Sequence, residues 1–483
     1  MNIQSKSLGK NAFLNGFKNV LNLLFPLVTF PYVSKILNVE GIGQYNFAQA
    51  SVSYFSLIAG LGISSYAIRE GAKYRERKKD FDIFASEVLL CNVISTIIAY
   101  VLLALCMIFV DKLKTYAALI WVFSIQIAFI TIGIEWIYSI YEEYEYITIR
   151  SILFKIVSII LIFVFVRDSG DTINYAAITV FASVGSNVLN LIHSRKYFKI
   201  VKVHMKDCTK HLKPIFVIFA SNIAIMIYVY SDTTMLGFMQ TDYEVGIYAV
   251  SVKIYNIVKN LLSSVLIVSI PRLSMYYGSG KIKEFKYTAQ KVYDAITALV
   301  MPAVIGLICV SKQVVLVISG EAYISAESSL RILCVALFFC IYGWFFSQCV
   351  LMPAQKEKTI LAATCVSAIV NITLNFYLIP IWKENAAAFT TVVAEFIMFF
   401  VCVIYGLKIT KIELLNRNML GVLTGCVGII CGCKVVLLFD LKPITQLAGA
   451  ILVSGMIYGL ILILFRNNII YGFLRKVCQT HEK

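Results

Sequence analysis

Lysine side chains occur inside stretches of this chain that are otherwise strongly apolar. Lys18, Lys155, Lys253 and Lys259 each lie among Leu, Ile, Val and Phe. An ionisable side chain is costly inside a bilayer, so it usually faces an aqueous cavity or a partner. A lysine near a helix end can instead extend its ammonium group to the surface, which is an alternative for Lys18 and Lys155. The pattern predicts a positively charged cavity that binds an anion such as a phosphate.

Asparagine side chains accompany these lysines at helical spacing. Asn11, Asn15 and Asn22 share one helical face with Lys18, and Asn256 and Asn260 lie beside Lys253 and Lys259. Amides on such a face can line a polar cavity, or they can form hydrogen bonds between packed helices. We expect these five asparagines to line the cavity.

Few acidic residues lie within the apolar stretches. Asp232 occurs in the segment Ser-Asp-Thr-Thr, Glu395 lies in mid-stretch, and Glu135 lies closer to an end. A membrane carboxylate can bind Na⁺ or a proton and couple transport to an ion gradient. It can equally neutralise a nearby lysine and do nothing more. Asp232 and Glu395 are therefore candidates for ion coupling.

The elements that position these residues are long apolar stretches. Hydrophobic residues make up 59% of the 483 residues and charged residues only 14%, whereas a soluble chain carries about 25% charged residues. About 20 apolar residues span a bilayer, and inside lipid the backbone must satisfy itself as helix. The sequence predicts an all-α polytopic membrane protein with about 14 transmembrane helices, at 12–34, 42–66, 83–110, 115–139, 147–166, 172–194, 214–238, 245–270, 289–310, 328–352, 359–381, 385–407, 418–439 and 444–465.

Basic residues are concentrated in alternate connections between these stretches, most densely in 69–79 and 195–213. Arg150 is interpreted as a residue of the fourth connection. Basic connections stay in the cytoplasm, so both termini are expected to be cytoplasmic. The net charge of +16 then reflects an anionic membrane surface and requires no nucleic acid. The 13 cysteines have no metal-site spacing, and no cofactor is expected.

An internal repeat is indicated at an offset of 203 residues. Gly43 aligns with Gly246, Tyr45 with Tyr248, and Arg69 with Arg272 at this offset. It contains an even number of predicted helices, so the two copies share one orientation, as in transporters built from parallel repeats. We expect a six-helix lobe at 1–205, a second at 206–410, and two additional helices with a tail at 411–483.

Several segments resemble the polysaccharide exporters. They are NVEGIGQYNFA at 38–48, GIEWIY at 133–138 followed by YEYI at 144–147 and Arg150-Ser151, DTTMLGF at 232–238, VGIY at 245–248, and SIPRL at 269–273. In order, they make the chain similar to Wzx-type O-antigen or polysaccharide repeat-unit flippases of the multidrug/oligosaccharidyl-lipid/polysaccharide exporter superfamily. The resemblance covers about residues 5–410.

The resemblance implies a V-shaped two-lobe fold around a central cavity in the bacterial inner membrane. It implies a substrate, undecaprenyl-diphosphate-linked oligosaccharide, that is flipped from the cytoplasmic to the periplasmic leaflet with Na⁺ or H⁺ as coupling ion. It also implies that the chain functions together with other polysaccharide assembly proteins. Lys18 and Lys253 or Lys259 match the basic cavity residues of these flippases, although no Arg lies in the first two predicted helices.

Two other functions fit a chain of this class. A drug or cation antiporter of the same fold would favour an acidic cavity, whereas the residues here are net basic. A membrane O-antigen polymerase or a lipid-linked glycosyltransferase would need catalytic acids or bases on an exposed loop, but even the longest connections here are short, and they are basic. The sequence favours a transporter that is not an enzyme.

Overall fold

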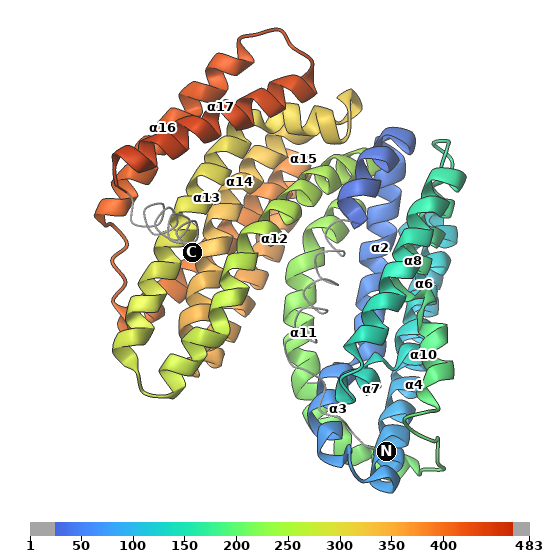
Figure 1. Cartoon of the computed structure of the whole chain (residues 1–483). Coiled ribbons are helices and arrows are strands. Elements are labelled where there is room, and N and C mark those ends of the chain that lie inside the picture. The colour runs from blue at the N-terminus through green and yellow to red at the C-terminus, as the bar shows by residue number, and fades with distance from the viewer. Residues whose placement is uncertain (1–24, 467–483) are drawn as a thin grey trace. The chain divides into compact units, whose positions relative to one another are not determined.

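The computed structural model describes residues 25–466, and within them every regular element is a helix (Figure 1). The described chain divides into two compact units, residues 1–246 and 247–483. The boundary expected between the two repeated lobes, at 205/206, lies one helix before this division. The repeat itself stays a prediction.

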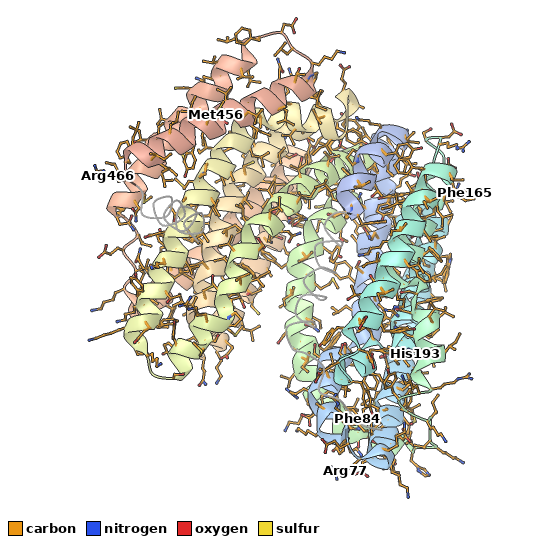
Figure 2. The ribbon with its side chains drawn as sticks, in the orientation of Figure 1. Arg77, Phe84, Phe165, His193, Met456 and Arg466 are labelled. Atoms are coloured by element: carbon orange, nitrogen blue, oxygen red, sulfur yellow. The ribbon has the colours of Figure 1, made fainter. Side chains whose placement is uncertain are left out.

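The first unit begins with a helical segment at residues 25–36. Arg77 and Phe165 lie at opposite ends of this unit (Figure 2). Its further elements are α2 (Asn38–Gly60), α3 (Ile63–Gly71), η1 (Ala72–Tyr74), α4 (Lys78–Phe109), α5 (Asp111–Thr115), α6 (Ala117–Gly133), α7 (Glu135–Ile140), α8 (Tyr144–Phe165), α9 (Thr172–Val180), the π-helical η2 (Phe181–Gly185), α10 (Asn187–Ser194) and α11 (Met205–Met239).

The second unit starts within the first turns of α12 (Asp242–Gly278). The two C-terminal helices, α16 and α17, pack against each other and against α13. The remaining elements are α13 (Ile282–Ile318), η3 (Glu321–Tyr323), α14 (Ala326–Trp344), the π-helical η4 (Phe345–Leu351), α15 (Glu357–Thr410), α16 (Arg417–Leu437) and α17 (Pro443–Leu464).

Among the described residues, 11 helices are long and apolar enough to cross a membrane. One of them, α15, has 54 residues and covers the two predicted helices at 359–381 and 385–407. Lys383, with φ of 52° and ψ of −129°, interrupts it between them. The 17-residue α6 and the short α7 together cover the predicted helix at 115–139. Each predicted helix thus coincides with helical structure wherever the residues are described.

The two glycines of the proposed repeat lie in one reciprocal contact of the first unit. A Cβ atom added to Gly43 would lie 1.8 Å from the carbonyl oxygen of Asp242, and one added to Gly246 would lie 2.0 Å from that of Val39. Asp242 and Val39 are themselves equivalent at the repeat offset. Only glycine permits so close a backbone approach. The Asp242 carboxylate also accepts hydrogen bonds from Gln44 Nε2 (3.2 Å) and Tyr116 Oη (2.5 Å).

A buried polar cluster joins three helices of the first unit where α3, α4 and α11 meet. Tyr66 Oη lies 2.6 Å from His211 Nδ1, and His211 Nε2 lies 2.9 Å from Glu87 Oε2. Lys210 Nζ donates to Glu87 Oε1 at 2.8 Å. Apolar side chains from the same helices surround the cluster, so its hydrogen bonds hold α11 to α3 and α4.

Candidate anion-binding pocket

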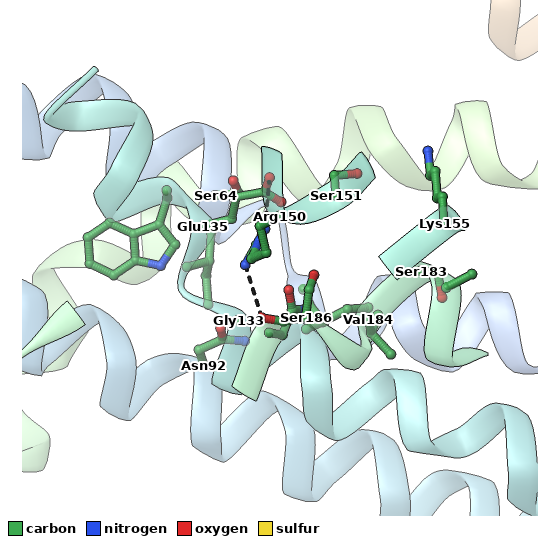
Figure 3. Close-up of a pocket in the computed structure, with 16 residues that line it drawn as sticks. Ser64, Asn92, Gly133, Glu135, Arg150, Ser151, Lys155, Ser183, Val184 and Ser186 are labelled. Atoms are coloured by element: carbon green, nitrogen blue, oxygen red, sulfur yellow. Dashed lines mark hydrogen bonds and ion pairs between the residues drawn. The ribbon is translucent and has the colours of Figure 1, made fainter. Parts of the chain in front are cut away.

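The first unit contains a polar pocket of about 430 Å³ lined by residues of α3, α4, α6, α7, α8, η2 and α10 (Figure 3). The break after α6 shapes one wall. Ile134 adopts the left-handed conformation (φ 34°), so the chain turns sharply and Glu135 begins α7 at the pocket. Two cations from α8, Arg150 and Lys155, line the same space.

Arg150 is the most buried charge of this pocket, with 6% of its surface exposed. Its Nη1 donates to the carbonyl oxygen of Ser186 at 3.2 Å, drawn as a dashed line in Figure 3, and its Nη2 lies 3.8 Å from Glu135 Oε1. The guanidinium carbon lies 5.7 Å from the centre of the Tyr146 ring. Arg150 Nε is buried and has no hydrogen-bond partner among the described residues. The guanidinium therefore retains one buried donor without a partner, which is an unusual and costly arrangement.

Amide side chains stabilise the backbone around this arginine. Asn187 Nδ2 donates to the carbonyl oxygen of Phe129 (2.9 Å), and Asn190 Nδ2 donates to that of Gly133 (2.8 Å). The Gly133 carbonyl belongs to the last turn of α6, where helical partners are missing, and the Phe129 carbonyl lies just before this turn. The asparagines of α10 thus fix the end of α6 and, with it, the position of Glu135.

The pocket carries two cations and one carboxylate among its lining residues, an excess of one positive charge. The sequence predicted Lys155 as a site residue, and the structure places it here. The sequence also predicted that Arg150 belongs to a connection between helices. This prediction is wrong, because Arg150 lies inside α8, which begins at Tyr144. The available signal was the position of Arg150 three residues inside the predicted helix at 147–166. Its burial, however, depends on α7 and α10.

Two of the other predicted lysines belong to the second unit. Lys253 and Lys259 are half-buried on α12. Lys259 Nζ lies 5.5 Å from the centre of the Tyr255 ring, and Tyr255 Oη donates to Glu395 Oε1 at 3.4 Å. Glu395 is buried and interacts electrostatically with Lys259. Both roles weighed for this carboxylate, coupling an ion and neutralising a lysine, stay predictions.

The remaining predicted residues are placed only in part. Asn256 and Asn260 are exposed on α12, and Asp232 is buried in α11 of the first unit. Four of the predicted residues lie outside the described residues: Asn11, Asn15, Lys18 and Asn22.

Comparison with known proteins decides the family. The family described as polysaccharide biosynthesis protein matches residues 8–277, more than half of the chain. The chain belongs to this polysaccharide biosynthesis family. Two curated relatives share the name "Putative O-antigen transporter". The protein from Escherichia coli (strain K12) is 23% identical over 399 residues, 82% of this chain and 95% of the relative. The protein from Shigella dysenteriae is 24% identical over 377 residues, 77% of this chain and 92% of the relative.

Solved structures show the fold of this family member. The lipid II flippase MurJ in an inward closed conformation is similar with a TM-score of 0.75, at 16% identity, covering 95% of this chain and 99% of MurJ. An inward-facing multidrug resistance MATE family transporter is similar with a TM-score of 0.62, at 15% identity, covering 80% of this chain and 94% of the transporter. The predicted fold class, an all-α membrane protein, is confirmed.

Proposed function

We propose that this chain is a flippase for an undecaprenyl-diphosphate-linked oligosaccharide, an O-antigen or capsule repeat unit. It moves this lipid from the cytoplasmic to the outer leaflet of the bacterial inner membrane, with both of its own termini in the cytoplasm. The observation that carries the proposal is Arg150, a buried guanidinium with an unsatisfied Nε, on a pocket it shares with Lys155. The family and the named relatives support the same function.

In this proposal the pocket binds the diphosphate. A phosphate oxygen accepts a hydrogen bond from the Arg150 guanidinium, and Lys155 supplies a second positive charge. Arginine presents donors in a planar fork that suits phosphate oxygens. The 3.8 Å separation of Arg150 and Glu135 is long for a charge-assisted hydrogen bond, so a phosphate at 2.7–2.9 Å competes effectively. Glu135 keeps the guanidinium in place while the pocket is empty.

The glycan occupies polar space beside this pocket, and the polyprenyl tail stays in lipid. Lys18, Lys253 and Lys259 are further candidates for contacts with the anionic substrate, and Asn11, Asn15, Asn22, Asn256 and Asn260 are candidates for hydrogen bonds to sugar hydroxyls. Alternating access around the site, as in other transporters built from repeats, then exposes the headgroup to the opposite leaflet. No covalent bond is made or broken, so the chain acts as a transporter and not as an enzyme.

Asp232 and Glu395 are the candidates for binding the coupling ion, Na⁺ or H⁺. Both are carboxylates buried within membrane helices, and binding a cation there removes the penalty of an isolated charge. A multidrug or cation antiporter remains the rival function. The excess positive charge of the pocket in the first unit disfavours a cationic substrate.

Flipping by purified protein in proteoliposomes tests the proposal. The vesicles contain undecaprenyl-diphosphate oligosaccharide, and an impermeant sugar-modifying reagent reports the exposed leaflet, with and without a Na⁺ or pH gradient. We expect Arg150→Ala to slow flipping by at least about tenfold, since a charge-assisted hydrogen bond contributes about 1.5–3 kcal/mol. Arg150→Lys should retain part of the rate.

Arg167→Ala is the matched control, because Arg167 is exposed in the connection between α8 and α9. Lys155→Gln tests the same pocket if Arg150→Ala does not fold. Normal flipping by well-folded Arg150→Ala and Lys155→Gln variants would remove the diphosphate from this pocket. Uptake of a soluble cation by vesicles that flip no lipid would favour the antiporter instead.

A further inference from the structure

The second unit contains a separate cavity of about 550 Å³ between α12 and α13, close to the turn that joins them. Arg272 and Tyr276 of α12 and Tyr287 and Lys291 of α13 line it, together with Glu284. None of these residues takes part in the pocket of the first unit. The cavity therefore requires its own explanation.

Both cations of this cavity pair with aromatic rings. Arg272 Nε and Nη2 donate to Tyr276 Oη at 3.1 and 3.0 Å, and the guanidinium carbon lies 5.5 Å from the centre of that ring. Lys291 Nζ lies 4.3 Å from the centre of the Tyr287 ring. Among the described residues, neither cation forms an ion pair with a carboxylate. The Tyr276 hydroxyl accepts from Arg272, so its own hydrogen can still be donated to an anion.

The other side of the cavity is apolar and open. Val265, Val268 and Val292 line it, and Val268 is 81% exposed. They lie on α12, a helix that is long and apolar enough to cross a membrane, and on α13, and present an apolar surface beside the two cations. Arg272 follows Val268 toward the end of α12. Further positive charge comes from Lys281, Lys283 and Lys286, in the turn after α12 and the first turns of α13. A basic pocket between membrane helices that continues into an apolar groove suits a lipid headgroup with its acyl chain.

We propose that this cavity binds an anionic glycerophospholipid, with its phosphate between Arg272 and Lys291 and an acyl chain along Val268. Two cations and the Glu284 carboxylate leave one net positive charge, which a single phosphodiester neutralises. The pocket of the first unit has the same net charge, so the assignment to a phospholipid rests on the exposed apolar surface at Val268 beside the cations. The site is thus a place for a resident membrane lipid and does not depend on the identity of the transported substrate.

Binding of phosphatidylglycerol to the full-length purified protein tests this site. Native mass spectrometry would compare phosphatidylglycerol with phosphatidylcholine of the same acyl chains for the wild type and the R272Q/K291Q variant. A basic residue near an anionic surface contributes about fivefold in binding, so we expect the two changes together to lower the affinity for phosphatidylglycerol by about 25-fold. Phosphatidylcholine binding should change little.

The matched control is K281Q/K283Q, which removes the same charge from the turn and the start of α13, outside the cavity. R272K/K291R tests whether charge alone restores binding. Equal losses in R272Q/K291Q and K281Q/K283Q would overturn the site in favour of general surface charge. Displacement of phosphatidylglycerol by millimolar inorganic phosphate would identify a free-phosphate site and also overturn it. Tighter binding of undecaprenyl diphosphate than of phosphatidylglycerol at Arg272 and Lys291 would assign the cavity to substrate. Flipping is measured separately, so failure of this site leaves the Arg150 test intact.

Discussion

The reciprocal glycine contact gives the sharpest prediction about stability. Replacing Gly43 with Ala puts a Cβ atom 1.8 Å from the carbonyl oxygen of Asp242. Contacts of Cβ atoms below 3.0 Å essentially never occur, and a backbone carbonyl cannot rotate away as a side chain can. The first turn of α12 must therefore move away from α2.

The magnitude follows from opposing contributions. Overpacking costs about 1–3 kcal/mol, and the movement also weakens the hydrogen bonds that Gln44 and Tyr116 donate to Asp242, each contributing about 1.5–3 kcal/mol to a charged acceptor. Ala in place of a helical Gly stabilises the folded protein by about 1 kcal/mol, because the unfolded chain then has less backbone entropy. We expect Gly43→Ala to destabilise the protein by about 2 kcal/mol net, and Gly246→Ala to do the same through Val39.

Thermal unfolding of the purified variants, followed by tryptophan fluorescence, measures this effect. Gly455→Ala in α17 is the matched control, because a Cβ atom there meets no other atom within 4 Å; it should unfold at or slightly above the wild-type temperature. The double variant Gly43→Ala/Gly246→Ala should cost less than both single changes together, since one separation of the helices relieves both contacts. An unchanged unfolding temperature for Gly43→Ala, or strict additivity in the double variant, would refute the reasoning.

Three further predictions concern other parts of the first unit. Glu87→Ala should destabilise the protein by roughly 3 kcal/mol because it leaves buried His211 without its carboxylate partner. Lys210→Ala should cost under about 1 kcal/mol because the Lys210 side chain is 59% exposed. Equal unfolding temperatures for the two variants would contradict this prediction. Asn190→Leu should lower the stability by about 1–3 kcal/mol because it leaves the Gly133 carbonyl unsatisfied. The flipping rate should also fall, because Glu135 and Arg150 lose their fixed positions. A stable variant with full activity would show that α10 does not position the pocket. Backbone N–H groups of Arg167 and Asp168 hold the pKa of Asp171 below its usual value. The contribution of Asp171 to stability is therefore present above a pH of about 4 and is lost as the pH falls through the lowered pKa. Asp171→Asn should show a flatter acid dependence of unfolding between about pH 5 and 2, and an unchanged dependence would show that Asp171 does not contribute.

The sequence by itself predicted the helices well because lipid allows few alternatives. An apolar stretch long enough to cross the membrane must satisfy its own backbone hydrogen bonds, so length and hydropathy together define the element. Even the interruption at Lys383 was readable, since a lysine followed by Glu and Asn divides two apolar stretches. The sequence used Gly43 and Gly246 only to align the proposed repeat, and the close backbone approach at both glycines appeared only in the structure.

The candidate site was predicted only in part. Lys155 was found because a lysine among apolar residues is conspicuous. Arg150 was assigned to a connection because it lies near a helix end among tyrosines and a glutamate. Its burial is produced by α7 and α10, which are separated from it by turns whose geometry depends on Ile134 and on the π-helical segment η2.

Composition and periodicity therefore determined which segments are membrane helices, because those properties act locally along the chain. The tertiary structure alone decided which charges meet: Arg150 with Glu135 and Lys155, Lys259 with Glu395, and Arg272 with Lys291 across one cavity. A charge interacts with whatever lies within a few ångströms, and in a low-dielectric interior that neighbour decides its energy. Neighbours from distant helices follow from packing, which no local pattern in the sequence specifies.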